Sequence, residues 1–341
     1  MSDAPGWDAI DAALAPLYGK QEPRHWGTAI KYALGGPDPL DGISAYAAEG
    51  HWHYVSYGLS ELYAKESPDP KISGYGFELS FRLARGPKVA EPPLWPASFL
   101  QNLARYVFNS GNVFAPGHHV DLNGPIALEE STSIVAALFA ADPELPAIDT
   151  PNGRLEFVQV VGATLDEYGA TRRWDTRGML EVMAEGNPKL VTDLRRKSIL
   201  DDPQAAKRIA ERGEREGSSM SCVYVTQLAW MATPEAAELT LGAMVVEELV
   251  EMLKARLGNE RDFALMGPGL EVLLRPREKS RWGSKKQNGF VELSPADVDA
   301  LRAALKPARG VYSNPGFPGF SIRVQPTEIR DQAGKILRVM G

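Results

Sequence analysis

The sequence predicts an α+β protein built from two mixed α/β domains in tandem, with largely antiparallel sheets. Its 341 residues suffice for two or three domains of ordinary size. Segments that alternate like strands follow one another in runs, without the strict strand–helix alternation that is typical of parallel α/β folds. Turn signals gather at residues 217–234, and a new helical pattern starts at Pro234. We therefore expect a first domain at residues 1–232 and a smaller second domain at residues 233–341.

The first domain is expected to open with a helix and to continue with strands. Over residues 7–18, apolar side chains recur at helical spacing, which predicts an amphipathic helix. A turn system rich in Gly and Pro covers residues 31–42, and a strand over residues 51–58 follows it. Residues 77–83 alternate apolar and polar side chains without a fault. That alternation predicts a half-buried strand that runs antiparallel to its neighbour.

Shorter elements complete the first domain. Pro96 suits the first turn of a helix whose apolar stripe extends to Phe108. Further strands are expected at residues 133–139, 154–163, 189–194 and 220–231, and helices at residues 175–185 and 201–216.

The second domain is expected to begin with a long helix. Leu and Val side chains form a helical stripe over residues 234–257, and Gly258 ends it. The pattern then predicts strands near 263–275 and 289–293, a helix capped by Ser294, a Gly/Pro loop at 310–320 and a last short strand.

Composition is typical of a folded protein without disulfides. Apolar residues make up 44% of the chain and charged residues 24%, and Cys222 is the single cysteine. One cysteine excludes an internal disulfide and a four-cysteine zinc site, and it fits a reducing compartment. The sequence starts without a signal-peptide pattern, and no apolar run is long enough to span a membrane. We expect a cytoplasmic protein that does not bind membranes.

Charge argues against nucleic acid as a partner. The formal net charge is −7 at pH 7, whereas sequence-independent binding to nucleic acid needs a positive surface. The one basic run, residues 275–286, could touch an acidic partner, but such runs usually form solvated loops and we expect one here.

Nucleophile and metal motifs are weak. Ser56 lacks the first glycine of a nucleophile elbow, and Cys222 has no histidine in its half of the chain. His51 and His53 share one face of the predicted strand, and His118 could supply a third nitrogen ligand. Because His-x-His alone is not a zinc signature, hydrogen-bonded histidines at strand ends are the favoured interpretation. A metal-assisted hydrolase that uses these three histidines remains an alternative, and no cofactor is expected.

Aromatic residues gather in the first 110 residues, where they indicate either a binding surface or a core. Tyr54 and Tyr57 lie in the predicted strand at 51–58, and Tyr106 lies in the helix that starts near Pro96. Tyrosine supplies a large contact area at interfaces, although its ring is more often mostly buried. Both interpretations stay open from the residues alone.

Six blocks of residues together carry a resemblance to a known family. The blocks are the Gly/Pro turn at 31–42, the strand at 51–63, GFELSFRL at 76–83, LARYVF at 103–108, TPNG with FVQVVG at 150–162, and LVTDLRR at 190–196. Their order and spacing over residues 7–200 resemble the amino-terminal domain of the suppressor of fused family. Several multi-residue blocks in one order are far more specific than a single short motif. The carboxy-terminal third is similar to the family only in layout.

The resemblance implies a non-enzymatic protein that holds another protein. In animal members of the family, two domains clamp a short extended peptide of a zinc-finger transcription factor, which adds as a strand in the cleft between them. The resemblance places Tyr106 in this cleft. It places His118 where the family has an aspartate that receives a histidine of the peptide, so an imidazole replaces a charge-assisted acceptor.

The expected function is to sequester or neutralise a partner protein. We expect an extended segment of the partner to lie near Tyr106 and His118, with Tyr54 and Tyr57 as further contacts. The chain lacks the long acidic or serine-rich insertions of animal members, so it resembles a compact bacterial relative with a different ligand. Bacterial relatives are similar to immunity proteins, which makes a toxin the expected partner. A scaffold subunit whose aromatic residues are all core is a further alternative.

Overall fold

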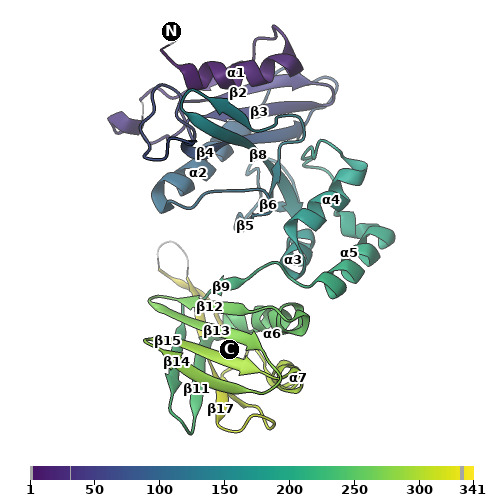
Figure 1. Cartoon of the computed structure of the whole chain (residues 1–341). Coiled ribbons are helices and arrows are strands. Elements are labelled where there is room, and N and C mark those ends of the chain that lie inside the picture. The colour runs from purple at the N-terminus through teal and green to yellow at the C-terminus, as the bar shows by residue number, and fades with distance from the viewer. Residues whose placement is uncertain (1–2, 31, 331–333) are drawn as a thin grey trace. The chain divides into compact units, whose positions relative to one another are not determined.

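The computed structural model describes residues 3–30, 32–330 and 334–341 and shows a mixed α/β fold with mostly antiparallel strand pairs (Figure 1). The fold class that the sequence predicts is therefore confirmed. The chain forms two compact units. Unit 1 comprises Met1–Gly169 and Thr176–Ala206, and unit 2 comprises Ala170–Asp175 and Lys207–Gly341. Units 1 and 2 thus divide earlier in the chain than the expected domains.

A mixed sheet forms the centre of unit 1, with its strands in the order β1-β2-β3-β4-β8-β6-β5 and with β7 paired to β8. The strands are β1 Arg24–Gly27, β2 Gly42–Ala48, β3 His51–Tyr57, β4 Ile72–Ala84, β5 His119–Asp121, β6 Ile134–Ala141, β7 Ile148–Thr150 and β8 Gly153–Thr164. The helices of the chain are α1 Pro5–Tyr18, α2 Trp95–Ser110, α3 Leu165–Arg173, α4 Thr176–Gly186, α5 Pro203–Glu216, α6 Val246–Ala255 and α7 Pro295–Ala304. β4 pairs with β8 in parallel, and the other pairs of this sheet are antiparallel.

Helices cover both faces of the unit 1 sheet (Figure 1). Ile10 of α1 shares a buried cluster with Val55 and Tyr57 of β3. Leu100 of α2 belongs to a second buried cluster, which contains Tyr54 of the same strand. Because side chains of a strand alternate between its two faces, the apolar residues of β3 divide between the two clusters, and every residue of the strand is buried.

The expectation of a half-buried strand at 77–83 is wrong for its polar face. Glu78, Ser80 and Arg82 of β4 are fully buried, because they point to the face that α1 covers. Each finds polar partners there. The Glu78 carboxylate accepts hydrogen bonds from the backbone N–H of Gly58 and of Ser60, both at 2.9 Å. Buried polar groups of this kind are stable only when they are hydrogen-bonded.

The turn system at 31–42 packs against the end of β3. Gly58 has φ of +133°, and a Cβ at this position would lie 2.9 Å from the backbone nitrogen of Asp41. Only glycine tolerates both the positive φ and the close contact with the Asp41 backbone. This contact therefore holds the turn against the end of the strand. Lys31, the first residue of the expected turn, lies outside the described residues.

Most expected elements of unit 1 are confirmed, with one exception. The helices expected at 7–18 and 175–185, for example, correspond to α1 and α4. The expected strand at 189–194 is wrong, because Thr192 makes only an isolated bridge to Leu83. The backbone of this segment instead binds side chains of the unit 1 sheet, as the next subsection describes.

Unit 2 contains two larger sheets, in the orders β10-β11-β17-β16 and β14-β15-β13-β12-β9, and a β18–β19 pair. The strands are β9 Cys222–Tyr224, β10 Leu228–Ala232, β11 Ala237–Gly242, β12 Phe263–Gly267, β13 Leu270–Pro276, β14 Arg281–Lys285, β15 Asn288–Leu293, β16 Gly310–Ser313, β17 Phe320–Gln325, β18 Thr327–Arg330 and β19 Ile336–Met340. Side chains of α6, α7 and both larger sheets form one buried cluster. The cap expected for α7 is confirmed, because the Ser294 side chain accepts from the Asp297 N–H.

Three expectations for this part of the chain are wrong. The single strand expected at 220–231 is two strands, β9 and β10, which belong to different sheets. The long helix expected at 234–257 is a strand, β11, followed by a short 3-10 turn and by α6. Leu239 and Leu241 are buried on one face of β11, and β11 pairs in parallel with β17. The apolar residues of this segment therefore follow the two-residue period of a strand and not the helical stripe. The basic run at 275–286 is not a solvated loop throughout, since Arg281–Lys285 forms β14.

Candidate functional site

Tyr106 is an exposed aromatic residue of α2. The same helix buries Phe99, Leu103 and Val107, which recur every four residues along one face. This arrangement leaves Tyr106 47% exposed. The Tyr106 hydroxyl accepts a hydrogen bond from Asn112 Nδ2 at 3.0 Å. Both the position and the orientation of the phenol are thereby defined.

Two aromatic rings, Phe114 and Phe139, connect Tyr106 to the core of unit 1. The Tyr106 ring stacks on Phe114 with 5.5 Å between ring centroids, and Phe114 stacks on Phe139 with 4.2 Å. Phe139 in β6 is fully buried, and Phe114 is 7% exposed. The stack supports the inner face of the Tyr106 ring and leaves the outer face open to contact.

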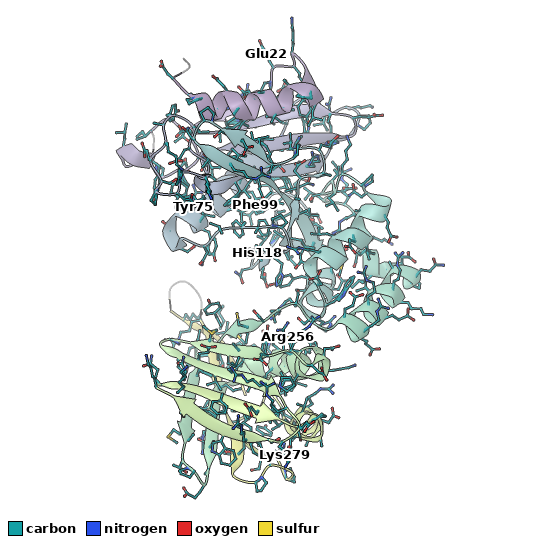
Figure 2. All side chains as sticks on the ribbon, viewed as in Figure 1. Glu22, Tyr75, Phe99, His118, Arg256 and Lys279 are labelled. Atoms are coloured by element: carbon teal, nitrogen blue, oxygen red, sulfur yellow. The ribbon has the colours of Figure 1, made fainter. Side chains whose placement is uncertain are left out.

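His118 lies beside this stack, directly before β5. The Phe139 N–H donates to the His118 carbonyl oxygen at 2.9 Å, and the Gly117 N–H donates to the Phe139 carbonyl oxygen at 2.8 Å. The His118 side chain is exposed, and Figure 2 shows it in the region of unit 1 that carries β5 in Figure 1. The structure therefore brings Tyr106 and His118 to one part of unit 1.

β5 is the edge strand of this sheet. It pairs with β6, and no strand of the described residues pairs with its other side. The Leu122 N–H donates to the Val135 carbonyl oxygen at 3.0 Å, so Leu122 directs its backbone groups toward β6. Alternate residues of an antiparallel strand face opposite sides, so the N–H and C=O of Asp121 point to the open side. An open edge of this kind can pair with another extended chain.

Basic side chains flank His118. Arg177 of α4 donates to the Pro116 carbonyl oxygen at 3.2 Å and packs against Gly117. The His119 ring places Nδ1 3.0 Å from Thr176 Oγ1 and therefore belongs to the internal packing. A guanidinium that contacts the backbone directly before His118 favours an acidic or hydrogen-bond-accepting group in whatever binds there.

Tyr54 and Tyr57 do not belong to this surface, which corrects the expectation that they contact a partner. Both side chains are fully buried. The Tyr54 hydroxyl donates to the Pro93 carbonyl oxygen at 2.7 Å, and the Tyr57 hydroxyl donates to Asp11 Oδ1 at 2.9 Å. Burial raises the pKa of both phenols. Their hydroxyls donate internal hydrogen bonds, and their rings are packed in the core.

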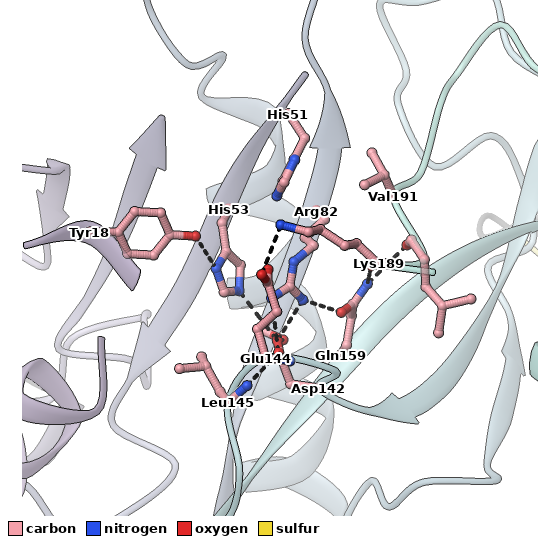
Figure 3. A network of polar contacts seen from close by, with 12 residues as sticks. Tyr18, His51, His53, Arg82, Asp142, Glu144, Leu145, Gln159, Lys189 and Val191 are labelled. Carbon is pink, nitrogen blue, oxygen red and sulfur yellow. Dashed lines mark hydrogen bonds and ion pairs between the residues drawn. The ribbon is translucent and has the colours of Figure 1, made fainter. Parts of the chain in front are cut away.

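His53 is likewise part of an internal network, shown in Figure 3. Its Nδ1 lies 2.7 Å from the Tyr18 hydroxyl, and its Nε2 lies 3.3 Å from Asp142 Oδ2. Arg82 donates to the two oxygens of Asp142 at 2.7 and 2.9 Å. Because a carboxylate only accepts, the neutral imidazole carries its proton on Nε2 and accepts from Tyr18 at Nδ1.

The network extends to the segment that was expected to be a strand. Arg82 also bonds Gln159 and pairs with Glu144, and Lys189 pairs with Glu144 at 2.8 Å. Gln159 Nε2 donates to the Lys189 and Leu190 carbonyl oxygens, both at 2.9 Å. These bonds occupy backbone groups near residue 190 that a regular strand would use. The network thus fixes β3, β4 and β8 to the segment after α4.

Burial controls the titration of this network. It lowers the pKa of His53 to about 4, so the imidazole is neutral at neutral pH. Burial alone would raise the pKa of Asp142, but hydrogen bonds from His53 and Arg82 hold it well below its usual range. Burial also lowers the pKa of His51, whose Nδ1 lies 3.0 Å from the Glu49 carbonyl oxygen.

The three histidines of the hydrolase alternative do not form one site. His51 and His53 are buried, whereas His118 is exposed. Across residues 3–30, 32–330 and 334–341, no group of three or more His, Cys, Asp or Glu side chains is placed to hold a metal ion. The proposed ligand set is therefore wrong, and the site is better described as a contact surface.

Several residues of the site escape sequence reasoning. Phe114 follows the end of α2, and Phe139 was assigned only to a predicted strand. Nothing in the sequence pairs Phe139 with His118, because β5 is only three residues long. Arg177 belongs to a predicted helix whose neighbours the sequence does not specify. The uninterrupted apolar run of β6 was the one signal that could have placed Phe139 in a core.

Comparisons with known proteins agree with this fold. The family description "Suppressor of fused protein (SUFU)" matches residues 36–197. The mouse Suppressor of fused homolog is 39% identical over 319 residues, which cover 87% of this chain and 65% of the mouse protein. The human homolog is 39% identical over 245 residues, 66% of this chain and 50% of the human protein. The matched part of the chain thus spans less than two thirds of either relative.

The fold of this chain is also similar to those of solved structures. The crystal structure of Drosophila Suppressor of Fused has a TM-score of 0.82 and 25% identity, covering 94% of this chain and 97% of that one. A chain in the Sufu–Fu complex has a TM-score of 0.57 and 35% identity, covering 61% of this chain and 98% of that one.

The fold and the site define a two-unit α/β protein with an open sheet edge beside a supported aromatic residue. The chain belongs to the suppressor of fused family. A bacterial source finds no support, since the curated relatives are from mouse and human. No helix within the described part of the chain is long and apolar enough to cross a membrane.

Proposed function

We propose that this chain is a non-enzymatic binding protein that holds an extended segment of a partner protein along the open edge of β5. The observation that carries the proposal is the direction of the Asp121 backbone groups toward that edge, beside Tyr106 and His118. The Sufu–Fu complex is a relative bound to another protein, which supports a binding role for this chain as well.

The segment would bind as an added strand. Its backbone would exchange hydrogen bonds with the N–H and C=O of Asp121, which supplies affinity without regard to sequence. One of its side chains would pack on the outer face of the Tyr106 ring, which the aromatic stack holds in place. An acidic or accepting side chain would meet His118 and Arg177, and this contact would supply specificity.

Holding a partner in this way would sequester it and so regulate it negatively. A toxin as the partner draws no support from the animal relatives. A cytoplasmic location and a binding cleft between the two domains stay predictions of the sequence. The edge of β5 suffices for the proposal.

Substitutions at Asp121 test strand addition directly. A partner would be recovered with the whole chain as bait, and its bound segment would be synthesised as a peptide. Asp121→Pro removes the outward N–H, and we expect it to weaken peptide binding at least about tenfold. Asp121→Ala keeps the N–H and is the matched control, with affinity expected within about threefold of the native chain. Native affinity in a folded Asp121→Pro protein would contradict the proposal.

A further inference from the structure

One cavity of unit 1 has no role in the binding described above. It has a volume of about 450 Å³ and lies where the ends of β3 and β4 meet the start of α2. Its apolar walls are formed by Trp52, Leu83, Val89, Pro93, Trp95 and Leu194. An apolar cavity with a few polar groups at its margin is the usual form of a binding pocket.

Trp52, which lines this cavity, carries a buried hydrogen-bond donor without a partner among the described residues. The residue is 5% exposed, and within the described residues its Nε1 has no hydrogen-bond partner. An indole N–H can only donate, so the missing group is an acceptor. Leaving such a donor buried and unpaired costs about 1–3 kcal/mol. A ligand that brings an acceptor would recover this cost.

Arg85 forms one wall of the cavity and covers the Trp52 ring. Its guanidinium carbon lies 4.4 Å from the ring centroid, and its Nε donates to the Val89 carbonyl oxygen at 2.9 Å. Because Trp52 Nε1 has almost no exposed surface, an acceptor reaches it only when a neighbouring side chain moves. Arg85 is partly exposed and lies over the ring, so it is the side chain that we expect to move.

The margin of the cavity carries more negative than positive charge. The margin contains three acidic residues, Glu91, Glu130 and Asp193, and two basic residues, Arg85 and Arg195. The Arg85 guanidinium already contacts the Trp52 ring. Glu91 and Glu130 are both exposed. This balance disfavours an organic anion, although the cavity requires an acceptor. A neutral carbonyl next to an apolar group satisfies both conditions, and a basic group would complement the margin.

We propose that this cavity receives one apolar side chain of a partner polypeptide, with the adjoining backbone carbonyl accepting from Trp52 Nε1 and a basic residue next in sequence meeting Glu91 and Glu130. The cavity would act as an anchor pocket, apart from the β5 edge. Its occupant is identified by three features of the pocket, namely the apolar walls, the unpaired donor and the acidic margin.

The indole N–H signal of Trp52 in a nitrogen–proton correlation spectrum reports on this pocket. The whole isotope-labelled chain would be titrated with acetyl-leucyl-lysine amide. We expect the Trp52 signal to move downfield and to saturate at millimolar peptide. Acetyl-leucyl-glutamate amide should bind at least about fivefold more weakly, and acetyl-glycyl-lysine amide should cause no saturable shift. Trp52→Phe identifies the signal by its loss.

Other results would overturn the proposal. An unmoved Trp52 signal excludes the anchor pocket, and equal shifts with the glycyl peptide exclude an apolar anchor. Equal affinity for the lysine and glutamate peptides excludes the acidic margin as a determinant. Should Trp52→Phe fail to fold, Val89→Phe at the exposed rim fills the cavity and must abolish the shift. Asp121→Pro should leave the shift unchanged, so this test is independent of the β5 proposal.

Discussion

Phe139 and His118 are joined through their backbones at the edge of the unit 1 sheet, where the Phe139 N–H donates to the His118 carbonyl oxygen at 2.9 Å. The Phe139 ring also lies beneath Phe114, which in turn supports Tyr106. One fully buried residue of β6 therefore positions both candidate contact residues. The positions of Tyr106 and His118 on the surface thus depend on a residue of the core.

Tyr106→Ala should weaken partner binding by about 1–3 kcal/mol, which is typical of an aromatic hot spot. The substitution removes the outer ring of the stack and leaves Phe114 and Phe139 in place. Isothermal titration with the partner peptide measures the effect. Tyr63→Ala is the matched control, because Tyr63 is exposed to a similar extent, 43% against 47%. Equal losses in both variants would argue against a specific contact at Tyr106.

His118→Asp should reverse the charge preference of the site. The imidazole and the nearby Arg177 favour an acidic side chain in the peptide, whereas a carboxylate at position 118 favours a basic one. Two versions of the partner peptide, with Glu or Lys at the facing position, would be compared in competition. We expect their affinity ratio to change at least about tenfold between the native chain and the variant. An unchanged ratio would remove His118 from the site.

The exposure of Tyr106 and the burial of Tyr54 show what the sequence could and could not predict. Helical spacing places Tyr106 next to a buried stripe, so its partial exposure can be read from α2 alone. Tyr54 and Tyr57 lie on opposite faces of a strand, and no local pattern reveals that helices cover both faces. The contact between Phe139 and His118 depends on strand pairing across the fold, which a single sequence does not specify.

Asp142→Asn should destabilise the fold by about 3 kcal/mol or more, because it leaves the buried Arg82 guanidinium without its counter-charge. An amide N–H₂ would also face the donors of Arg82 and His53. Urea unfolding followed by circular dichroism measures the change. Asp149→Asn is the matched control, since Asp149 pairs with Arg154 at the surface, and we expect it to cost less than about 1 kcal/mol. A similar loss in the free energy of unfolding for both variants would contradict a stabilising role of the buried network.

Stability should fall as the pH drops from about 6.5 to about 4. Burial lowers the pKa of His53 to about 4, whereas an unfolded histidine titrates near 6.5. Within this window the unfolded chain binds a proton that the folded chain excludes, so unfolding becomes more favourable. The difference in the pKa of His53 between the two states corresponds to about 3 kcal/mol in the free energy of unfolding. Burial lowers the pKa of His51 and His25 as well, which acts in the same direction.

Urea midpoints measured across this pH range test the effect, with His53→Gln as the comparison. Glutamine does not titrate, so the variant should lose part of the pH dependence even if it is less stable at neutral pH. An identical dependence in both proteins would mean that the pKa of His53 is the same in the folded and the unfolded chain.

The stripe at 234–257 and the alternation at 77–83 show a second limit of sequence patterns. Leu239 fits both a helical stripe and a strand, and pairing with the parallel strand β17, far along the chain, decided the outcome. Glu78 and Arg82 follow a surface pattern, yet their partners Ser60 and Asp142 come from other strands and loops. Such pairs become visible only when the fold is known.

The parallel pairing of β4 with β8 has a consequence for synthesis of the chain. Leu79 lies opposite Val158, and the intervening segment contains α2, β5, β6 and β7. The local β2–β3 hairpin can close early and β4 can pair with β3, but the other side of β4 has no partner until β8 has left the ribosome. Glu78 and Arg82 lie in β4, and ionisable side chains of this kind discourage neighbouring nascent chains from pairing with an exposed strand. The polar residues that later fill the interior thus also protect the growing polypeptide from aggregation.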